Sequence, residues 1–237
     1  MIYIASIDTC KADDLLPLVC EERREYALKY RMEADRIRSL ACALLLQYAY
    51  TDAGGKVLKA IRLTHDDNGK PVILEDAPSP LPYFSISHTG SYVAVATGNT
   101  PVGIDIERIR TCNDSIIRRF FSGEEQAFIN GEGKRQAGLS RPAATDLAFT
   151  QIWTLKESFL KATGQGMKLG LDTFSVIGEN GDFTVRQDHD DHTYTGEILE
   201  APDGYVLSVC RMNGENTEKD NGQGGMIHEI CLSALLP

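Results

Sequence analysis

The run Pro101-Val-Gly-Ile-Asp-Ile-Glu-Arg108 constrains the fold more than any other stretch of this chain. Its apolar residues are mostly β-branched, which predicts a buried strand. Side chains alternate between the two faces of a strand, so the apolar residues share one face. Asp105 and Glu107 share the other face, about 6 to 7 Å apart. Two carboxylates side by side on a buried strand require a physical explanation.

Two explanations are open from the residues alone. In an antiparallel sheet, one face of a strand is often in contact with water, and the carboxylates could simply lie there. Alternatively, Asp105 and Glu107 could hold a divalent cation such as Mg²⁺, with water and a substrate phosphate completing its coordination. The rest of the chain has to decide between a solvated face and a metal site.

The composition limits the class of protein. With 237 residues and 42% hydrophobic residues, the chain can bury a full core, as one large domain or as two halves of about 100 residues each. The formal net charge of −10 argues against a general affinity for nucleic acid or for an anionic membrane surface. An anionic ligand would therefore need a local basic site.

The cysteines and the apolar runs indicate the compartment. The six cysteines include no Cys-x-x-Cys pair, and the residues that follow Met1 lack the basic flank and apolar core of a signal peptide. No apolar run approaches the ~20 residues that cross a bilayer. We expect a cytoplasmic protein with reduced thiols and no membrane segment.

The pattern of elements is mixed α+β. We expect a strand over 1–8, mostly helix over 13–53, strands over 83–88 and 91–97, a loop over 130–145, a helix over 146–163, strands over 173–176, 183–187, 194–199 and 205–210, and one more strand or helix within 226–237. Turns are predicted at 68–71, 78–82, 89–90, 179–182 and 202–204, and a mobile polar segment at 214–225. Helix followed by strands occurs twice, which hints at an internal duplication.

The helix around Ile152–Ala162 carries a second pair of charges. A rotation of 100° per residue collects its apolar residues on one stripe and puts Glu157 and Lys161 on the opposite side. They could form a surface ion pair, or a carboxylate and an ammonium that face one site, the first on a metal and the second on a phosphate. The glycines of 164–170 follow a helix instead of preceding one, which excludes a Rossmann turn.

Other polar groups also have two interpretations. Arg36 and Arg38 could form surface ion pairs with Glu33 and Asp35, and Ser87 and His88 at a turn could be exposed or could meet a phosphate. Arg118 and Arg119 lie among apolar residues, which suits an acidic partner or an ordinary amphipathic helix. Residues 188–192 are interpreted as a solvated turn in preference to a zinc site.

Several of these motifs together resemble one family. The motifs are Gly103-Ile-Asp-Ile-Glu107, Phe121-Ser-x-x-Glu125 and Trp153-x-x-Lys-Glu-Ser-x-x-Lys161, preceded by Asn68-Gly-Lys-Pro71 and Phe84-Ser-Ile-Ser-His-Thr-Gly90. In this order and spacing they are similar to the 4′-phosphopantetheinyl transferases of the long, surfactin-synthetase-activating type. The resemblance implies an α+β (α/β) fold of two similar halves in a pseudo-dimer, 1–103 and 104–237. Each half would be a small sheet packed on a long helix, with the active site in the cleft between them.

The resemblance also implies a reaction. Coenzyme A would donate 4′-phosphopantetheine to a serine of an apo acyl or peptidyl carrier protein, and adenosine 3′,5′-bisphosphate would leave. Asp105, Glu107 and Glu157 would hold Mg²⁺, and Glu157 or a water on the metal would take the serine proton. Lys161 would stabilise the pyrophosphate. The residues implied to bind coenzyme A are Arg38, Lys70, Ser87, His88, Thr89, Lys156 and Lys161.

One departure and two alternatives accompany this hypothesis. Similar proteins carry lysines where this chain has Glu22-Arg-Arg-Glu25, so a role for Arg23 and Arg24 in binding coenzyme A is open. Carrier docking on Ser115–Phe128 is implied by position, with Arg118 and Arg119 facing an acidic carrier. The alternatives are a binding module for coenzyme A or a nucleotide without turnover, and a Mg²⁺-dependent phosphohydrolase. We expect a monomer.

Overall fold

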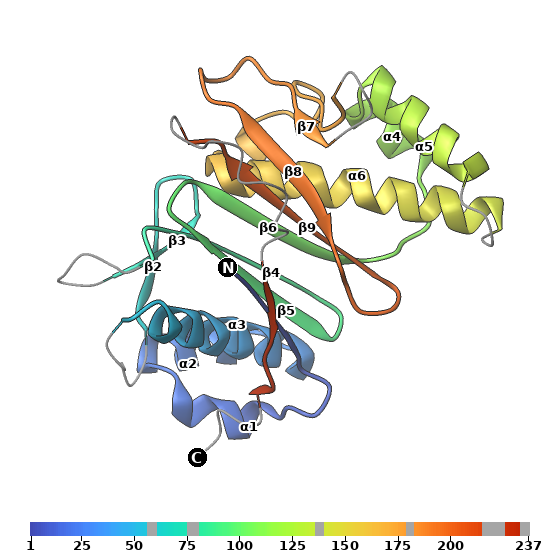
Figure 1. Cartoon of the computed structure of the whole chain (residues 1–237). Coiled ribbons are helices and arrows are strands. Elements are labelled where there is room, and N and C mark those ends of the chain that lie inside the picture. Colours follow the sequence, from blue (N-terminus) through green and yellow to red (C-terminus); the bar gives the residue numbers. More distant parts are fainter. Residues whose placement is uncertain (56–60, 75–80, 136–139, 179–182, 215–225, 233–237) are drawn as a thin grey trace. The chain divides into compact units, whose positions relative to one another are not determined.

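The computed structural model describes residues 1–55, 61–74, 81–135, 140–178, 183–214 and 226–232 (Figure 1). The chain divides into two compact units, Met1–Asn99 with Gly225–Pro237, and Thr100–Gly224. The boundary that we expected after residue 103 falls inside a strand, so the units part slightly earlier. The C-terminal segment, which we expected in the second half, belongs to the first unit because its strand pairs there.

The first unit is a four-stranded sheet packed on a long helix. Its elements are β1 (Ile2–Ser6), α1 (Ala12–Leu15), the 3₁₀ turn η1 (Leu16–Leu18), α2 (Glu21–Leu28), α3 (Glu33–Asp52), β2 (Leu63–His65), β3 (Pro71–Ile73), β4 (Tyr83–Thr89), β5 (Tyr92–Gly98) and β10 (Ile227–Glu229). The sheet order is β10-β1-β5-β4, with β10 parallel to β1 and the other pairs antiparallel, while β2 and β3 form a separate hairpin.

Helix α3 forms because its middle is apolar enough to be buried. The residues from Ser39 to Leu46 are all buried, and the helix packs on β5, β4 and β1. The predicted turns at 68–71 and 89–90 are confirmed, since Gly69 and Gly90 adopt φ of 84° and 53°. Glycine suits these positions because a Cβ atom disfavours positive φ. The Gly90 turn closes the β4–β5 hairpin.

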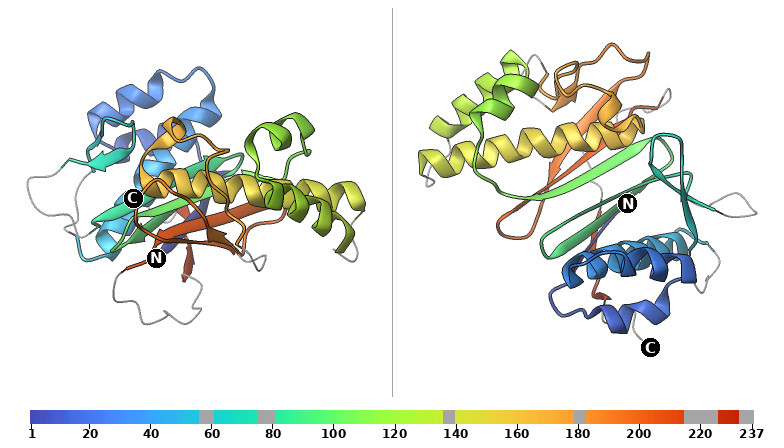
Figure 2. Two further views of the ribbon diagram at one scale, coloured as in Figure 1. Left: turned by 90° about the horizontal axis from the view of Figure 1, so that it is seen from above. Right: turned by 180° about the vertical axis from the view of Figure 1, so that it is seen from behind.

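The second unit repeats this construction with other additions. Its elements are β6 (Val102–Arg108), α4 (Asp114–Phe120), α5 (Gly123–Arg135), α6 (Arg141–Thr163), the 3₁₀ turn η2 (Gly166–Lys168), β7 (Thr184–Val185), β8 (Tyr194–Leu199) and β9 (Tyr205–Met212). The sheet order is β6-β9-β8-β7, all antiparallel. Helix α6 lies along one face of this sheet in every view, and α5 packs against α6 (Figures 1 and 2).

The two units share one core topology. In each, a first strand is followed by a long helix and then by two strands, and the last strand lies between the first and the second. This gives β1-β5-β4 beside α3 and β6-β9-β8 beside α6. The mixed α+β class and the repeated order of helix and strands agree with the sequence. The pseudo-dimeric packing of the halves stays a prediction.

Two expected elements were wrong in part. The expected loop over 130–145 contains the end of α5 and the start of α6, because Ser140 accepts a hydrogen bond from the Ala143 amide and proline stands in the first turn. The expected strand over 173–176 contributes only an isolated bridge between Ser175 and Arg186. Residues 75–80, 179–182, 215–225 and 233–237, where we expected turns, a mobile segment and the end of the chain, lie outside the described residues.

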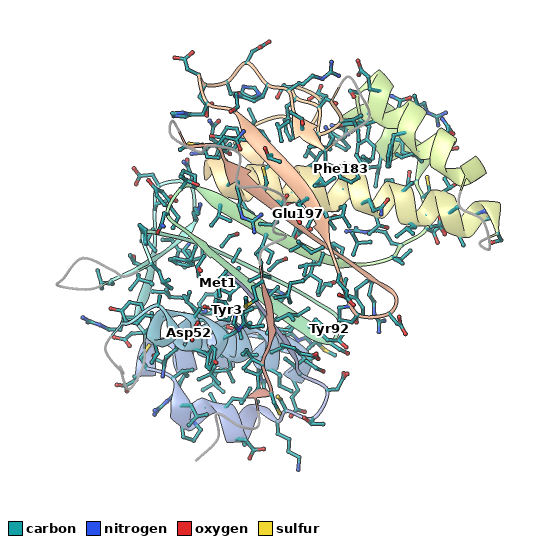
Figure 3. The ribbon with its side chains drawn as sticks, in the orientation of Figure 1. Met1, Tyr3, Asp52, Tyr92, Phe183 and Glu197 are labelled. Carbon is teal, nitrogen blue, oxygen red and sulfur yellow. The ribbon has the colours of Figure 1, made fainter. Side chains whose placement is uncertain are left out.

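Each unit also ties its first strand to the last turns of its long helix. In the first unit, the Tyr3 hydroxyl of β1 donates a 2.7 Å hydrogen bond to Asp52 of α3, and both side chains are labelled in Figure 3. In the second unit, Lys161 of α6 binds Asp105 of β6 at 2.7 Å.

Among the described residues, no helix is long and apolar enough to span a membrane.

A glycine sets the distance between β6 and α6. A Cβ atom on Gly103 would lie 1.8 Å from the Ser158 carbonyl oxygen and 2.5 Å from the Ala162 amide nitrogen. Both obstacles are backbone atoms, which cannot rotate aside as a side chain can. Any larger residue would therefore push β6 and its carboxylates away from α6.

We predict that Gly103→Ala destabilises the protein by about 1 to 3 kcal/mol, because the added methyl overpacks the interface between strand and helix. A lower urea midpoint at unchanged m-value would report this loss. Gly131→Ala in α5 is the matched control, since nothing lies within 4 Å of its added Cβ. The control should be neutral or more stable by up to about 1 kcal/mol, and equal midpoints for the two variants would contradict the prediction.

Candidate active site

Asp105 and Lys161 form the centre of the second unit's polar cluster. Asp105 is 5% exposed on β6, and its Oδ1 lies 2.7 Å from the Lys161 Nζ. The same ammonium donates a 3.0 Å hydrogen bond to the Ile104 carbonyl oxygen. The charge of Lys161 therefore compensates a carboxylate that would be costly to bury alone.

Glu157 lies within electrostatic reach of the same carboxylates. Burial raises the pKa of Glu157, the negative charges of Asp105 and Glu107 raise it further, and Lys161 and Arg110 oppose this shift. The sequence motif thus brings Glu157 and Lys161 to the face of β6 that carries Asp105. A half-buried carboxyl group beside other charged groups is a candidate for proton exchange in a reaction.

Glu107 is held by a different cation. Arg110 pairs with Glu107 at 2.6 Å, and its guanidinium lies over the Trp153 ring, 5.2 Å from the centroid. Trp153 is the first residue of the helix motif that we recognised in the sequence. Its role in the structure is to pack under Arg110, which in turn orients Glu107.

The three carboxylates suit a hard cation in chemistry and in charge. Asp105, Glu107 and Glu157 supply only oxygen donors, which Mg²⁺ prefers, and their mutual repulsion is the kind that a divalent cation relieves. In the described parts of the chain, however, no three His, Cys, Asp or Glu side chains are arranged as they stand to hold a metal. Lys161 and Arg110 balance the charge instead. The metal assignment stays a prediction.

Arg38 of the first unit forms one of the ion pairs that we expected and also contacts the β4–β5 turn. Its guanidinium forms the expected ion pair with Asp35, one turn away on α3. It also donates a 2.9 Å hydrogen bond to the Gly90 carbonyl oxygen, at the β4–β5 turn. The structure thus brings Arg38 to the turn that follows His88 and Thr89.

A cavity of about 220 Å³ lies beside this turn. Its lining includes His88 and three residues of the neighbouring helices, Arg23, Asp35 and Ser39, and also His65 from β2. Arg23 donates a 3.4 Å hydrogen bond to the Ser39 hydroxyl and also lines a second cavity of about 320 Å³. Cationic and imidazole side chains around one cavity can receive an anion.

Sequence reasoning missed His65 and left Arg23 open. His65 stands at the end of β2 and His88 near the end of β4, so only the fold brings both to one cavity. The sequence signal for Arg23 was its place beside Arg24 in the charged stretch before the long helix. Glu22 beside it lines only the second cavity among those described.

The other predicted residues of this unit, Ser87, Thr89 and Lys70, do not line the two cavities described above. Ser87 is buried and, by strand alternation, points to the face of β4 opposite to His88. Thr89 is the last residue of β4. Lys70 follows the Gly69 turn, where burial lowers the pKa of Lys70 and the nearby charge of Asp66 opposes that shift. Their predicted contacts with coenzyme A remain predictions.

Lys156 differs from our expectation. Its side chain is fully buried, and its Nζ lies 2.9 Å from Glu125 Oε1 and 2.8 Å from the carbonyl oxygens of Leu171 and Phe174. These three partners account for all three ammonium hydrogens. Burial lowers the pKa of Lys156 and the Glu125 charge raises it again. The predicted contact of Lys156 with coenzyme A therefore gains no support.

The surface around α4 agrees with both interpretations of its sequence. Arg118 and Arg119 are exposed, whereas the neighbouring apolar residues Ile116, Ile117 and Phe120 are half-buried against the core of the unit. The apolar residues thus have an ordinary packing role. The basic residues are left on the surface, where an acidic partner could meet them.

The comparisons with known proteins cover both units. The model described as 4′-phosphopantetheinyl transferase superfamily matches residues 101–210, and the model described as 4′-phosphopantetheinyl transferase, N-terminal, matches residues 10–100. The chain is 32% identical over 200 residues to "4′-phosphopantetheinyl transferase psf-1" of Bacillus pumilus, covering 84% of this chain and 81% of that protein.

Two further relatives are similar over much of their length. The chain is 30% identical to "4′-phosphopantetheinyl transferase Sfp" of Bacillus subtilis (strain 168), with 82% of this chain and 83% of that protein covered. It is 28% identical to "L-aminoadipate-semialdehyde dehydrogenase-phosphopantetheinyl transferase" of Pongo abelii, with 77% and 67% covered. The chain therefore belongs to the 4′-phosphopantetheinyl transferase superfamily.

Proposed function

We propose that this protein transfers the 4′-phosphopantetheine group of coenzyme A to a serine hydroxyl of an apo acyl or peptidyl carrier protein. The observation that carries the proposal is the cluster of Asp105, Glu157 and Lys161, which the matched family segment contains as a whole. A protein that only binds coenzyme A has no chemical need for clustered carboxylates around one ammonium group. Carboxylates and an ammonium together suit proton removal and the neutralisation of phosphate charge.

In the proposed reaction, the serine oxygen attacks the phosphorus atom that carries the pantetheine arm. A new O–P bond forms, the P–O bond to adenosine 3′,5′-bisphosphate breaks, and the serine proton passes to Glu157. The charges of Asp105 and Lys161 both act on Glu157, which supports a carboxylate of this cluster as the proton acceptor. Lys161 lies next to Asp105, where its positive charge would stabilise the pyrophosphate as the bond breaks.

We further propose that Asp105, Glu107 and Glu157 hold a Mg²⁺ ion. When bound, the ion would supply positive charge to the pyrophosphate oxygens. Before binding, Lys161 and Arg110 balance two of these carboxylates, as the structure has them. The residues thus have the donor chemistry for the ion and cations of their own that limit repulsion in its absence.

The adenosine and its 3′-phosphate would be bound by residues of the first unit. Arg38 and His88 lie at the β4–β5 turn and its cavity, and Lys70 follows the turn before β3. Arg23, which lines the same cavity, would supply a further positive charge there. We propose it as an additional contact.

The experiment that tests the function is a transfer assay with apo carrier proteins from fatty-acid, polyketide and nonribosomal-peptide synthesis. We expect one carrier to gain the mass of one phosphopantetheine, in the presence of both coenzyme A and Mg²⁺. Binding of coenzyme A without transfer to any carrier would favour a binding module. Release of phosphate from coenzyme A without a carrier would favour a phosphohydrolase.

We predict that Asp105→Asn lowers transfer by more than about 100-fold and weakens the dependence on Mg²⁺, because a metal contributes several kcal/mol to transition-state stabilisation. Transfer rates over a range of Mg²⁺ concentrations measure this effect. Glu197→Gln, which removes an exposed carboxylate paired with Arg211 in the same sheet, is the control. Near-normal transfer by the folded Asp105→Asn protein would refute the metal assignment.

We predict that Arg38→Gln raises the KM for coenzyme A by roughly 10- to 100-fold at similar kcat, because a charged hydrogen bond to the ligand is lost. Steady-state kinetics with saturating carrier measure both constants. Arg36→Gln is the control on the same helix, since its guanidinium binds the Tyr30 carbonyl oxygen. The assignment of Arg38 fails if both variants bind coenzyme A equally well.

We predict that Arg118→Glu combined with Arg119→Glu raises the KM for the carrier by about 10-fold or more, because like charges would then oppose an acidic carrier. The KM for coenzyme A should change little. Lys11→Glu combined with Lys29→Glu makes the same change in net charge on exposed residues of the first unit. Equal effects of the two double variants on carrier KM would argue against docking at α4.

A further inference from the structure

We propose that the buried pair of Glu125 and Lys156 positions α6, and thereby holds Glu157 toward the face of β6 that carries Asp105. Lys156 is then a positioning residue and not a ligand of coenzyme A. The inference rests on the proposed function, because its effect is read in the transfer reaction. It assigns a role to two residues of the recognised motifs that the proposed chemistry leaves unused.

The pair begins with a capping box at the start of α5. Ser122 precedes the first residue of the helix, its hydroxyl accepts a hydrogen bond from the Glu125 amide at 3.3 Å, and Glu125 Oε2 accepts one from the Ser122 amide at 2.8 Å. This reciprocal pattern explains the spacing of Phe121-Ser-x-x-Glu125. These two hydrogen bonds hold the Glu125 side chain at the start of α5 without help from any other helix or strand.

The other carboxylate oxygen joins two more segments. Glu125 Oε1 accepts a 2.8 Å hydrogen bond from the Val176 amide and lies 2.9 Å from Lys156 Nζ. The same ammonium donates to the carbonyl oxygens of Leu171 and Phe174. The start of α5, the middle of α6 and the segment from Leu171 to Val176 are thus joined at one point.

Through Lys156, the buried pair lies next in the chain to Glu157, the proposed proton acceptor. Lys156 directly precedes Glu157 on α6, so a rotation or shift of the helix at Lys156 moves Glu157 with it. Lys161 is anchored to Asp105 at the other end of the same stretch. The helix is therefore held on both sides of Glu157, and the two anchors are about 7.5 Å apart along its axis at 1.5 Å per residue.

The chemistry of the pair favours a positioning role over a purely stabilising one. Both side chains are fully buried, and the ammonium lies 4.4 Å from the centroid of the Phe174 ring. Apolar side chains of similar volume often stabilise a protein as well as a buried ion pair does. Directional hydrogen bonds, in contrast, fix the register and rotation of a helix, which apolar packing defines less sharply.

The test compares Lys156→Met, Glu125→Gln and the double variant in the transfer assay, at a temperature where circular dichroism and urea curves show each protein to be folded. We expect each single variant to lower kcat by between about 10- and 100-fold, as loss of supporting residues around a site does. The KM for coenzyme A should stay within about twofold of the parent value, because the residues that bind coenzyme A are unchanged.

The double variant separates a joint role from two independent ones. If the two residues act as one unit, the kcat of the double variant should be no lower than the kcat of the less active single variant. The control is Glu197→Gln combined with Arg211→Gln, which removes an ion pair between β8 and β9 of the same unit, with a contact of 3.3 Å. We expect this control to keep the parent kcat.

Three results would overturn the proposal. A rise in KM for coenzyme A in Lys156→Met at normal kcat, with losses that multiply in the double variant, would make Lys156 a ligand. If the folded variants keep the parent kcat, the pair has a purely structural role. The same conclusion follows if every variant fails to fold. A parent protein that transfers to no carrier overturns the proposed function first, which distinguishes the two failures.

Discussion

The close contact of β6 with α6 is the constraint on which the second unit depends. Gly103 has no side chain, so the strand lies against the helix backbone and Asp105 comes within 2.7 Å of Lys161. The burial of Asp105 is acceptable only with this ammonium beside it. A carboxylate, its counter-ion and Glu157 are thereby placed together on a rigid strand and a rigid helix, where small displacements would be costly for chemistry.

The first unit uses the same construction with other residues at the contact. Its strand β1 carries Tyr3, which binds Asp52 near the end of α3, where the second unit has Asp105 and Lys161. The Tyr3 ring also packs edge-on against Tyr48, four residues before Asp52. The matching contacts hold strand and helix together in both units, but only the second unit puts clustered carboxylates there. This difference agrees with the proposal that the chemistry takes place in the second unit.

The failures of sequence reasoning have identifiable physical causes. The expected loop over 130–145 was rich in glycine and charge, yet helix caps and packing on α6 outweigh weak helix propensity. Lys156 was expected at coenzyme A because the resemblance to the family implied it, and full burial of a lysine is rare enough that its sequence did not suggest it. Its burial depends on Glu125 and on two carbonyl oxygens that lie 15 and 18 residues further along the chain, and no local pattern reveals them.

The sequence by itself determined the strand that carries Asp105 and Glu107, the helix that carries Glu157 and Lys161, the turns at Gly69 and Gly90, and the family. These features depend on alternation, helical period and backbone conformations that glycine favours, all of which are local. Only the tertiary structure decided which cation balances which carboxylate, that Lys156 points inward, and that Arg23 and His65 share a cavity with His88. These outcomes depend on contacts between distant segments, which form only when the sheets and helices pack.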